Sequence, residues 1–196
     1  MRFKRYLCFL LVSGLVLLCT PAWVGAEKEL NYNYVQGQLA WYPSADLAKS
    51  SQDYLGIDMR GSYQILPDYP EFFAFGELQY LTDDADLTNF HFGGAYRGEI
   101  HEQTDFYGGL TIEYTKFDWD NGDDSDIALG LRGGVRHILT PDWELGGQLR
   151  LITGDYDYVG LRGNAQYALQ ENLGLVMELD LYDGELGFQG GVRYNF

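Results

Sequence analysis

Apolar and polar residues alternate with a period of two along most of this chain. Residues 185–196, ELGFQGGVRYNF, put Leu186, Phe188 and Val192 on one parity and Gln189 and Arg193 on the other. Successive side chains of a strand point to opposite faces, so the segment predicts a strand with one apolar face and one polar face. The segment also ends in an apolar aromatic residue, which favours contact with lipid over the exposed edge of a soluble sheet.

The same alternation recurs along the chain, in residues 30–42, 53–65, 72–81, 89–100, 105–117, 126–138, 143–153, 158–169, 173–182 and 185–196. Each segment approaches the ~9–11 residues with which a tilted strand crosses the hydrocarbon of a bilayer. An even strand number is typical of single-chain barrels. We therefore predict an all-β fold: an antiparallel up-and-down transmembrane β-barrel of about ten strands, with about eight as the alternative. Segments 30–42 and 72–81 fit least well, because Phe73 and Phe75 interrupt the polar face of the latter.

The connections between these segments alternate in character. Residues 66–71, 101–104, 140–142 and 170–172 are short, and two of these turns carry the prolines Pro67, Pro70 and Pro141. The connections 43–52, 82–88, 118–125, 154–157 and the Asp183-Gly184 turn are more acidic. We expect the first set in the periplasm and the second outside the cell.

The N-terminus has the pattern of a secretory signal peptide. Arg2, Lys4 and Arg5 precede an apolar run at 6–18, which is shorter than the ~20 residues of a spanning helix, and small residues end the segment at 26. Cys19 raises lipidation as an alternative, but bulky leucines precede it. We predict a signal peptide at 1–26 and a single transmembrane barrel domain at 27–196.

Composition after residue 26 excludes several classes of function. Both cysteines lie before that point, so the remaining chain has no disulfide and no cysteine metal site. The signal peptide also holds three of the 13 basic residues, which leaves 10 against 29 acidic ones, a net charge of −19. Such a chain does not bind nucleic acid through its phosphates. No apolar run is long enough for a transmembrane helix.

Every arginine after residue 26 falls on the polar parity, together with a similar number of carboxylates. The guanidinium group is the better partner for carboxylates in a confined space, and a barrel of this size encloses little more than its own side chains. We favour a lumen ion-pair network over the polar surface of a soluble protein. Its predicted members are Asp58, Arg60, Glu77, Arg97, Glu99, Glu113, Arg132, Arg136, Glu144, Arg150, Arg162, Glu178, Asp180, Glu185 and Arg193.

Aromatic residues of the apolar parity gather near the segment ends, as in the two aromatic girdles of a membrane barrel. We expect an outer girdle of Trp41, Tyr80, Phe90 and Tyr114, and an inner girdle of Tyr63, Phe72, Phe106, Trp143, Tyr167, Tyr194 and Phe196.

With these features the chain resembles the small Gram-negative outer-membrane β-barrel proteins, similar in size to the OmpA-like and opacity-type barrels. Gln189, Gly191, Tyr194 and Phe196 match the C-terminal signal that such proteins present to the barrel-assembly machinery. The resemblance implies a location in the outer membrane and says little about activity.

No catalytic residue, cofactor or cofactor-binding residue is predicted. His91, beside Asp84 and Asp86, is expected inward near the outer rim, but the serines show no nucleophile motif. Closely spaced carboxylates at Asp118, Asp120, Asp123 and Asp124 are weak candidates for a divalent metal such as calcium. Their spacing departs from an EF-hand, and a solvated hairpin tip is the favoured interpretation.

Three functions remain open at this point. The first is a non-enzymatic envelope protein of structural or surface-contact type, the second a narrow passive pore for small solutes, and the third a surface hydrolase. The expected partners are outer-membrane lipid, lipopolysaccharide and the barrel-assembly machinery, with no nucleic acid. The expected state is a monomer.

Overall fold

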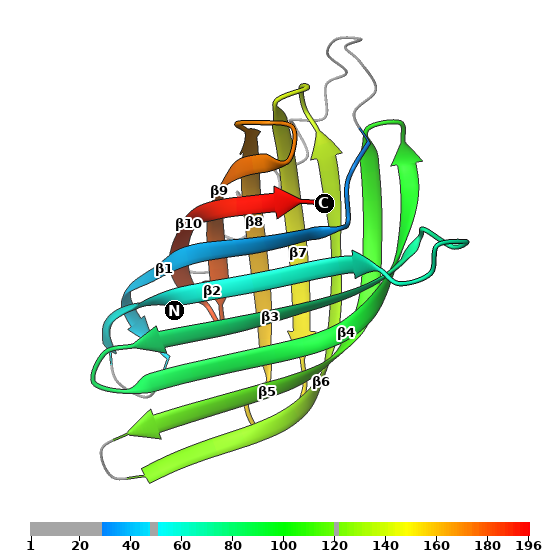
Figure 1. Ribbon diagram of the computed structural model, residues 1–196. Helices are drawn as coiled ribbons and strands as arrows, with labels where there is room; N and C mark the ends of the chain where they lie inside the picture. Colours follow the sequence, from blue (N-terminus) through cyan, green and yellow to red (C-terminus); the bar gives the residue numbers. More distant parts are fainter. Residues whose placement is uncertain (1–28, 48–50, 120–121) are drawn as a thin grey trace, which may run out of the picture.

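The computed structural model describes residues 29–47, 51–119 and 122–196, so the predicted signal peptide at 1–26 lies outside the described residues. Within the described residues, ten antiparallel strands close into a barrel, each pairing with its neighbours in the chain and β1 with β10 (Figure 1). They are β1 (Tyr34–Asp46), β2 (Ser51–Gln64), β3 (Phe72–Thr82), β4 (Asp86–His101), β5 (Thr104–Trp119), β6 (Gly122–Ile138), β7 (Trp143–Ile152), β8 (Tyr158–Ala168), β9 (Leu173–Tyr182) and β10 (Glu185–Asn195). The up-and-down barrel prediction is confirmed, with ten strands rather than eight in the described chain. None of the described residues belongs to a helix of the length and apolar character needed to cross a bilayer.

The alternation of the sequence separates the two faces of the barrel wall. On β1, Val35, Leu39 and Trp41 are exposed on the outside, while Gln36 and Gln38 are buried in the lumen. The outer face is therefore apolar and the inner face polar, the reverse of a soluble barrel.

Outward aromatic rings pack together near both ends of the barrel. Trp41 and Phe188 have ring centroids 5.9 Å apart, and Tyr63 and Phe196 lie 6.2 Å apart. Of the residues expected in the two girdles, Tyr114 and Trp143 are half-buried and the others are exposed.

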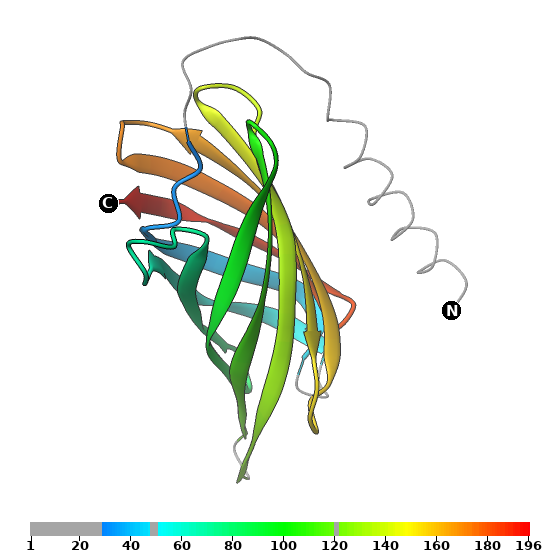
Figure 2. The ribbon, with the colours of Figure 1, turned by 90° about the vertical axis from the view of Figure 1, so that its right-hand side faces the viewer.

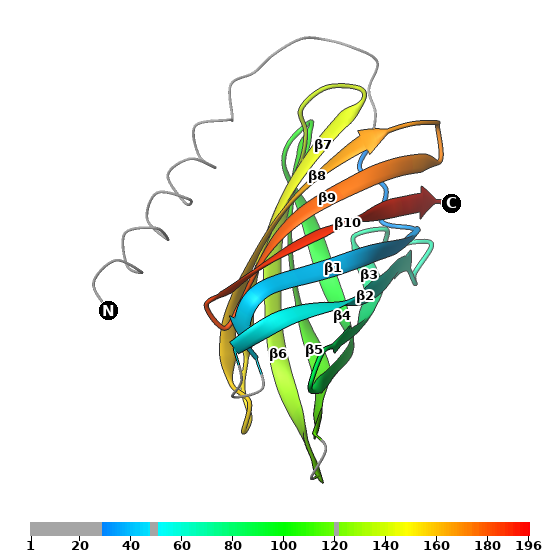
Figure 3. The ribbon, with the colours of Figure 1, turned by 90° about the vertical axis from the view of Figure 1, so that its left-hand side faces the viewer.

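The barrel has two different ends, which we name after the predicted orientation. The inner end carries Phe196 and the β2–β3, β4–β5, β6–β7 and β8–β9 turns, and the outer end carries the remaining turns. Figures 2 and 3 show that the β5–β6 hairpin projects farthest beyond the outer end. The sequence predicted a loop at 118–125, which is wrong: β5 continues to Trp119, and Asp118 pairs with Asp123. The hairpin is held by aromatic packing, since the ring of Phe117 lies 5.9 Å from that of Trp119 and 4.9 Å from that of Tyr156.

Two apolar clusters lie inside the barrel, one near each end. The outer cluster is Ala40, Tyr42, Ala45, Tyr54, Leu81, Ala85, Leu87, Phe117 and Tyr182, and the inner cluster is Leu30, Tyr32, Phe73, Ala95 and Ile138. The expected first strand at 30–42 is displaced, because β1 begins at Tyr34. Leu30 and Tyr32 instead enter the inner mouth and pack on Phe73. The interruption of the polar face of β3 is thus the contact surface for the segment before β1.

Candidate functional site: the barrel lumen

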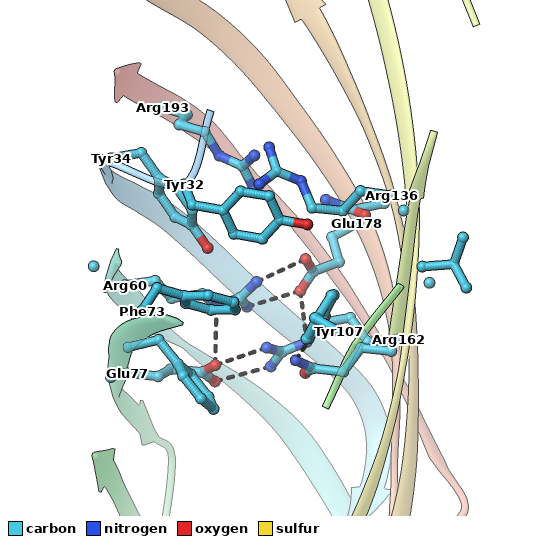
Figure 4. Close-up of a pocket in the computed structure, with 18 of the residues that line it drawn as sticks. Tyr32, Tyr34, Arg60, Phe73, Glu77, Tyr107, Arg136, Arg162, Glu178 and Arg193 are labelled. Carbon is cyan, nitrogen blue, oxygen red and sulfur yellow. Dashed lines mark hydrogen bonds and ion pairs between the residues drawn. The ribbon is translucent and has the colours of Figure 1, made fainter. Parts of the chain in front are cut away.

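Two arginines and two glutamates form a closed ring across the middle of the lumen (Figure 4). Arg60 of β2 contacts Glu77 of β3 at 3.0 Å and Glu178 of β9 at 2.8 Å. Arg162 of β8 contacts the same two carboxylates, Glu77 at 2.7 Å and Glu178 at 2.9 Å. The ring joins β2 and β3 to β8 and β9. In the closed sheet these two pairs of strands are separated by β1 and β10 on one side and by β4–β7 on the other, so the side chains cross the space enclosed by the barrel.

Two further carboxylates extend this ring. Asp58 contacts Arg60 at 2.8 Å, and Asp180 contacts Arg162 at 3.3 Å and also pairs with Arg150. The hydroxyl of Tyr42 donates a hydrogen bond to Asp180 over 2.7 Å. Charged groups removed from water in this way require partners, and each of these has them.

The remaining arginines hold carboxylates nearer the inner end and along β5–β7. Arg132 donates two hydrogen bonds to Glu113, at 3.0 and 2.8 Å. Arg136 makes the same two-fold contact with Glu144, at 2.8 and 3.1 Å. Arg193 lies 3.6 Å from the same carboxylate of Glu144. These forked pairs match the planar guanidinium to the planar carboxylate.

Most, but not all, of the predicted network residues come together. The ion pairs of the described residues do not include Glu99 or Glu185; Glu99 is exposed at the end of β4, and Glu185 opens β10 beside the outer turn. Both lie at strand ends, where the side chain is within reach of solvent. Arg97 pairs instead with Asp105 at 3.1 Å. Asp105 was missed by the sequence reasoning, although it shares the polar parity of Glu113 on the same segment.

The segment before β1 fills the inner mouth. The ring centroid of Tyr32 lies 4.7 Å from the guanidinium of Arg97, 4.4 Å from that of Arg136 and 4.7 Å from the ring centroid of Phe73. Figure 4 shows Tyr32 together with Arg136 and Phe73. Arg136 also donates a hydrogen bond to the backbone carbonyl of Asn31 over 2.8 Å. Cation–π contacts and a charged hydrogen bond therefore hold this segment inside the barrel.

A cavity of about 70 Å³ lies between Tyr32 and the central ring, which is room for a few water molecules. His91 lines it, with its ring 5.7 Å from Phe75 and its Nδ1 3.9 Å from Glu113. Only 4% of His91 is exposed. The prediction of His91 near the outer rim is wrong, because its place on β4 faces the middle of the lumen, opposite Glu77.

The acidic residues of the β5–β6 hairpin have partners within the protein. Lys116 contacts Asp118 at 2.8 Å and Asp123 at 3.7 Å. Asp124 accepts a hydrogen bond of 2.7 Å from the hydroxyl of Tyr156, and this bond raises the pKa of Tyr156 to about 12. Asp120 lies outside the described residues. Among the described residues, no group of three or more His, Cys, Asp or Glu side chains is placed to hold a metal ion.

The residues of the predicted assembly signal divide between the two faces of β10. Tyr194 and Phe196 are exposed on the outside. Gln189 is buried and donates to Tyr42 over 3.2 Å, while Gly191 packs directly against the backbone of Gly37 on β1. The lumen-facing pair therefore has a structural role at the seam between β1 and β10.

Comparisons with known proteins find the fold but no family. No family model matches the chain, and no curated protein matches it. Among solved structures, the NanC porin is similar with a TM-score of 0.50 and 14% identity, over 84% of this chain and 100% of that one. The KdgM porin has a TM-score of 0.49 and 12% identity, over 83% of this chain and 99% of that one. Neisserial surface protein A has a TM-score of 0.42 and 15% identity, over 86% and 100% of the two chains. The chain thus has the fold of a small outer-membrane β-barrel, as its likeness to the NanC porin shows.

Proposed function

We propose that this protein is a non-enzymatic barrel of the bacterial outer membrane, closed along its lumen and active through its outer surface. The burial of the central charges carries the proposal. Asp58 and Asp180 are 0% exposed, and Arg150 is 2% exposed. In a water-filled pore such side chains line the channel and are solvated. Here Asp58 pairs with Arg60 and Arg162, and Asp180 pairs with Arg150 and Arg162.

The lumen is obstructed in three successive layers. The inner cluster with Tyr32 fills one mouth, the Arg60–Glu77–Arg162–Glu178 ring crosses the middle, and the outer cluster lies above it. The apolar outer face and its aromatic girdles support a place in a membrane, with lipid and lipopolysaccharide as the immediate surroundings.

A narrow pore is the second candidate, and one observation favours it. The ring consists of side chains alone, and cavities of about 70 and 390 Å³ lie toward the two ends of the barrel. Rearrangement of side chains in the ring and in the outer cluster would join the two spaces.

Conductance across a planar lipid bilayer separates the two candidates. We expect the purified wild-type barrel to insert without steady conductance. Heat-modifiable migration on gels verifies that the protein is folded, and the open comparison is a variant that removes the ring, Arg60→Ser with Glu77→Ser, Arg162→Ser and Glu178→Ser, together with Tyr32→Ala at the inner mouth. Steady conductance of the wild-type protein would overturn the closed-lumen proposal, and silence of the wild type beside a conducting variant would exclude the pore.

A further inference from the structure

A second cavity, of about 390 Å³, opens at the outer end between the ends of β1, β5, β8 and β9. We call it the outer vestibule. Its volume falls within the range of small-molecule sites, ~300–1,000 Å³. Its walls are mainly aromatic, and they come from segments far apart in the sequence: Phe117, Trp119, Tyr156, Tyr158 and Tyr182.

The aromatic rings are held in place by one another. Phe117 and Trp119 stack nearly in parallel, at an interplanar angle of 11°, and Tyr156 packs 4.9 Å from Phe117. On the other wall, Tyr158 and Tyr182 lie 4.4 Å apart. The buried guanidinium of Arg150 lies 5.8 Å from the ring of Tyr158 and 5.9 Å from that of Tyr182, so a cation of the protein already contacts this pair. The faces of the Phe117, Trp119 and Tyr156 rings carry negative electrostatic potential, which attracts a cation.

Three carboxylates complete the lining: Asp46, Asp157 and Asp183. All three are exposed, and the ion pairs among the described residues include none of them. No lysine or arginine of the described chain lines the vestibule. Asp157 and Asp183 line the vestibule together, and burial and the negative charge of Asp157 raise the pKa of Asp183. A cation placed between them offsets that charge.

We propose that the outer vestibule binds a small organic cation, one with an alkylated ammonium group, against the aromatic walls and the Asp157–Asp183 pair. A hard metal ion is a poorer occupant, because it takes several oxygen ligands at once, and no three acidic side chains of the described residues are grouped closely enough to hold one. The proposal rests on the outward orientation given under the proposed function, and it holds whether or not the lumen conducts.

Calorimetric titration of the detergent-solubilised protein tests the proposal with a matched pair of probes. Choline carries a quaternary ammonium, and 3,3-dimethylbutan-1-ol is its neutral isostere. We expect choline to bind about tenfold or more tightly than the alcohol, as a desolvated cation–π site with a carboxylate requires. The double variant Asp157→Asn with Asp183→Asn is expected to lose about tenfold in choline affinity. Asparagine tolerates the positive φ of 48° at position 183, so the turn is retained.

Asp155→Asn is the control, because Asp155 is exposed in the same turn as Asp157 and does not line the vestibule. It should leave choline binding unchanged, and heat-modifiable migration on gels verifies that each variant folds. Equal affinity for choline and the alcohol, or no saturable binding of choline, would overturn the proposal. Conductance measured on the same preparation distinguishes the two proposals. A barrel that neither conducts nor binds choline would overturn only the proposed cation site. A barrel that conducts and binds choline would overturn only the proposed closed lumen.

Discussion

Replacing Arg162 is the sharpest test of the central ring. Arg162 contacts Glu77, Glu178 and Asp180 at 2.7, 2.9 and 3.3 Å, with 5% of its side chain exposed. Arg162→Met keeps much of the volume and removes the charge, which leaves buried carboxylates in excess. Removing one partner of a buried ion pair costs about 3–5 kcal/mol in the free energy of unfolding. We expect a loss in that range.

The measurement is equilibrium unfolding by urea in phospholipid vesicles, followed by tryptophan fluorescence. The matched control is Lys116→Ala, which breaks the solvent-screened contact with Asp118 and should cost much less than Arg162→Met. A double variant, Glu77→Gln with Arg162→Met, removes one of the unpaired charges and should recover part of the loss. The reasoning is refuted if Arg162→Met costs no more than Lys116→Ala, or if the double variant is no more stable than Arg162→Met alone.

Three other predictions concern the ends and the seam of the barrel. Tyr32→Ala removes two cation–π contacts, each worth about 0.5–2 kcal/mol, so limited proteolysis at residues 29–33 should become faster; an unchanged rate would show that the ring does not hold the segment. Gly191→Val should prevent refolding into vesicles in the absence of any assembly factor, because an added Cβ would lie 2.6 Å from the Cα of Gln38. The outward Gly190→Ala should refold, because the nearest atom to its added Cβ is 3.9 Å away. Refolding of both variants would contradict this packing argument. Asp124→Asn should lower the pKa of Tyr156 from about 12 toward about 10, and NMR titration of the tyrosine ring measures this shift. Because the pKa of Tyr156 is raised in the folded protein, its hydrogen bond to Asp124 stabilises the fold fully below pH ~10. That stabilisation is lost as the pH rises through the pKa of Tyr156 in the folded protein.

The strand pattern made the barrel predictable, because a period of two fixes which side chains face lipid and which face the lumen. Six predicted carboxylates and all seven arginines of the described chain lie in ion pairs for this reason. Parity alone does not tell how far along the strand a side chain lies. Glu99 was therefore included although it sits at an exposed end, and His91 was placed at the rim although it lies mid-lumen.

The contents of the two mouths were harder to predict. Tyr32 was assigned to a strand, since its segment alternates like the others. Its true position depends on the ring of Phe73 and on the two guanidinium groups beside it, which are brought together only by closure of the barrel. The outer vestibule likewise unites β1, β5, β8 and β9, and no local pattern of the sequence reveals such a grouping.

The central ring also has a consequence for the order of folding. Arg60 and Glu178 are 118 residues apart in the sequence, and Arg162 and Glu77 are 85 apart. Contacts of such long range form only after the loop between them has closed, so they are expected late, past the main barrier to folding. Interactions that are absent from the transition state slow unfolding and leave the folding rate nearly unchanged. The central ring is therefore expected to lower the rate of unfolding of the inserted barrel. It determines how long the folded protein persists in the membrane more than how fast the protein folds into it.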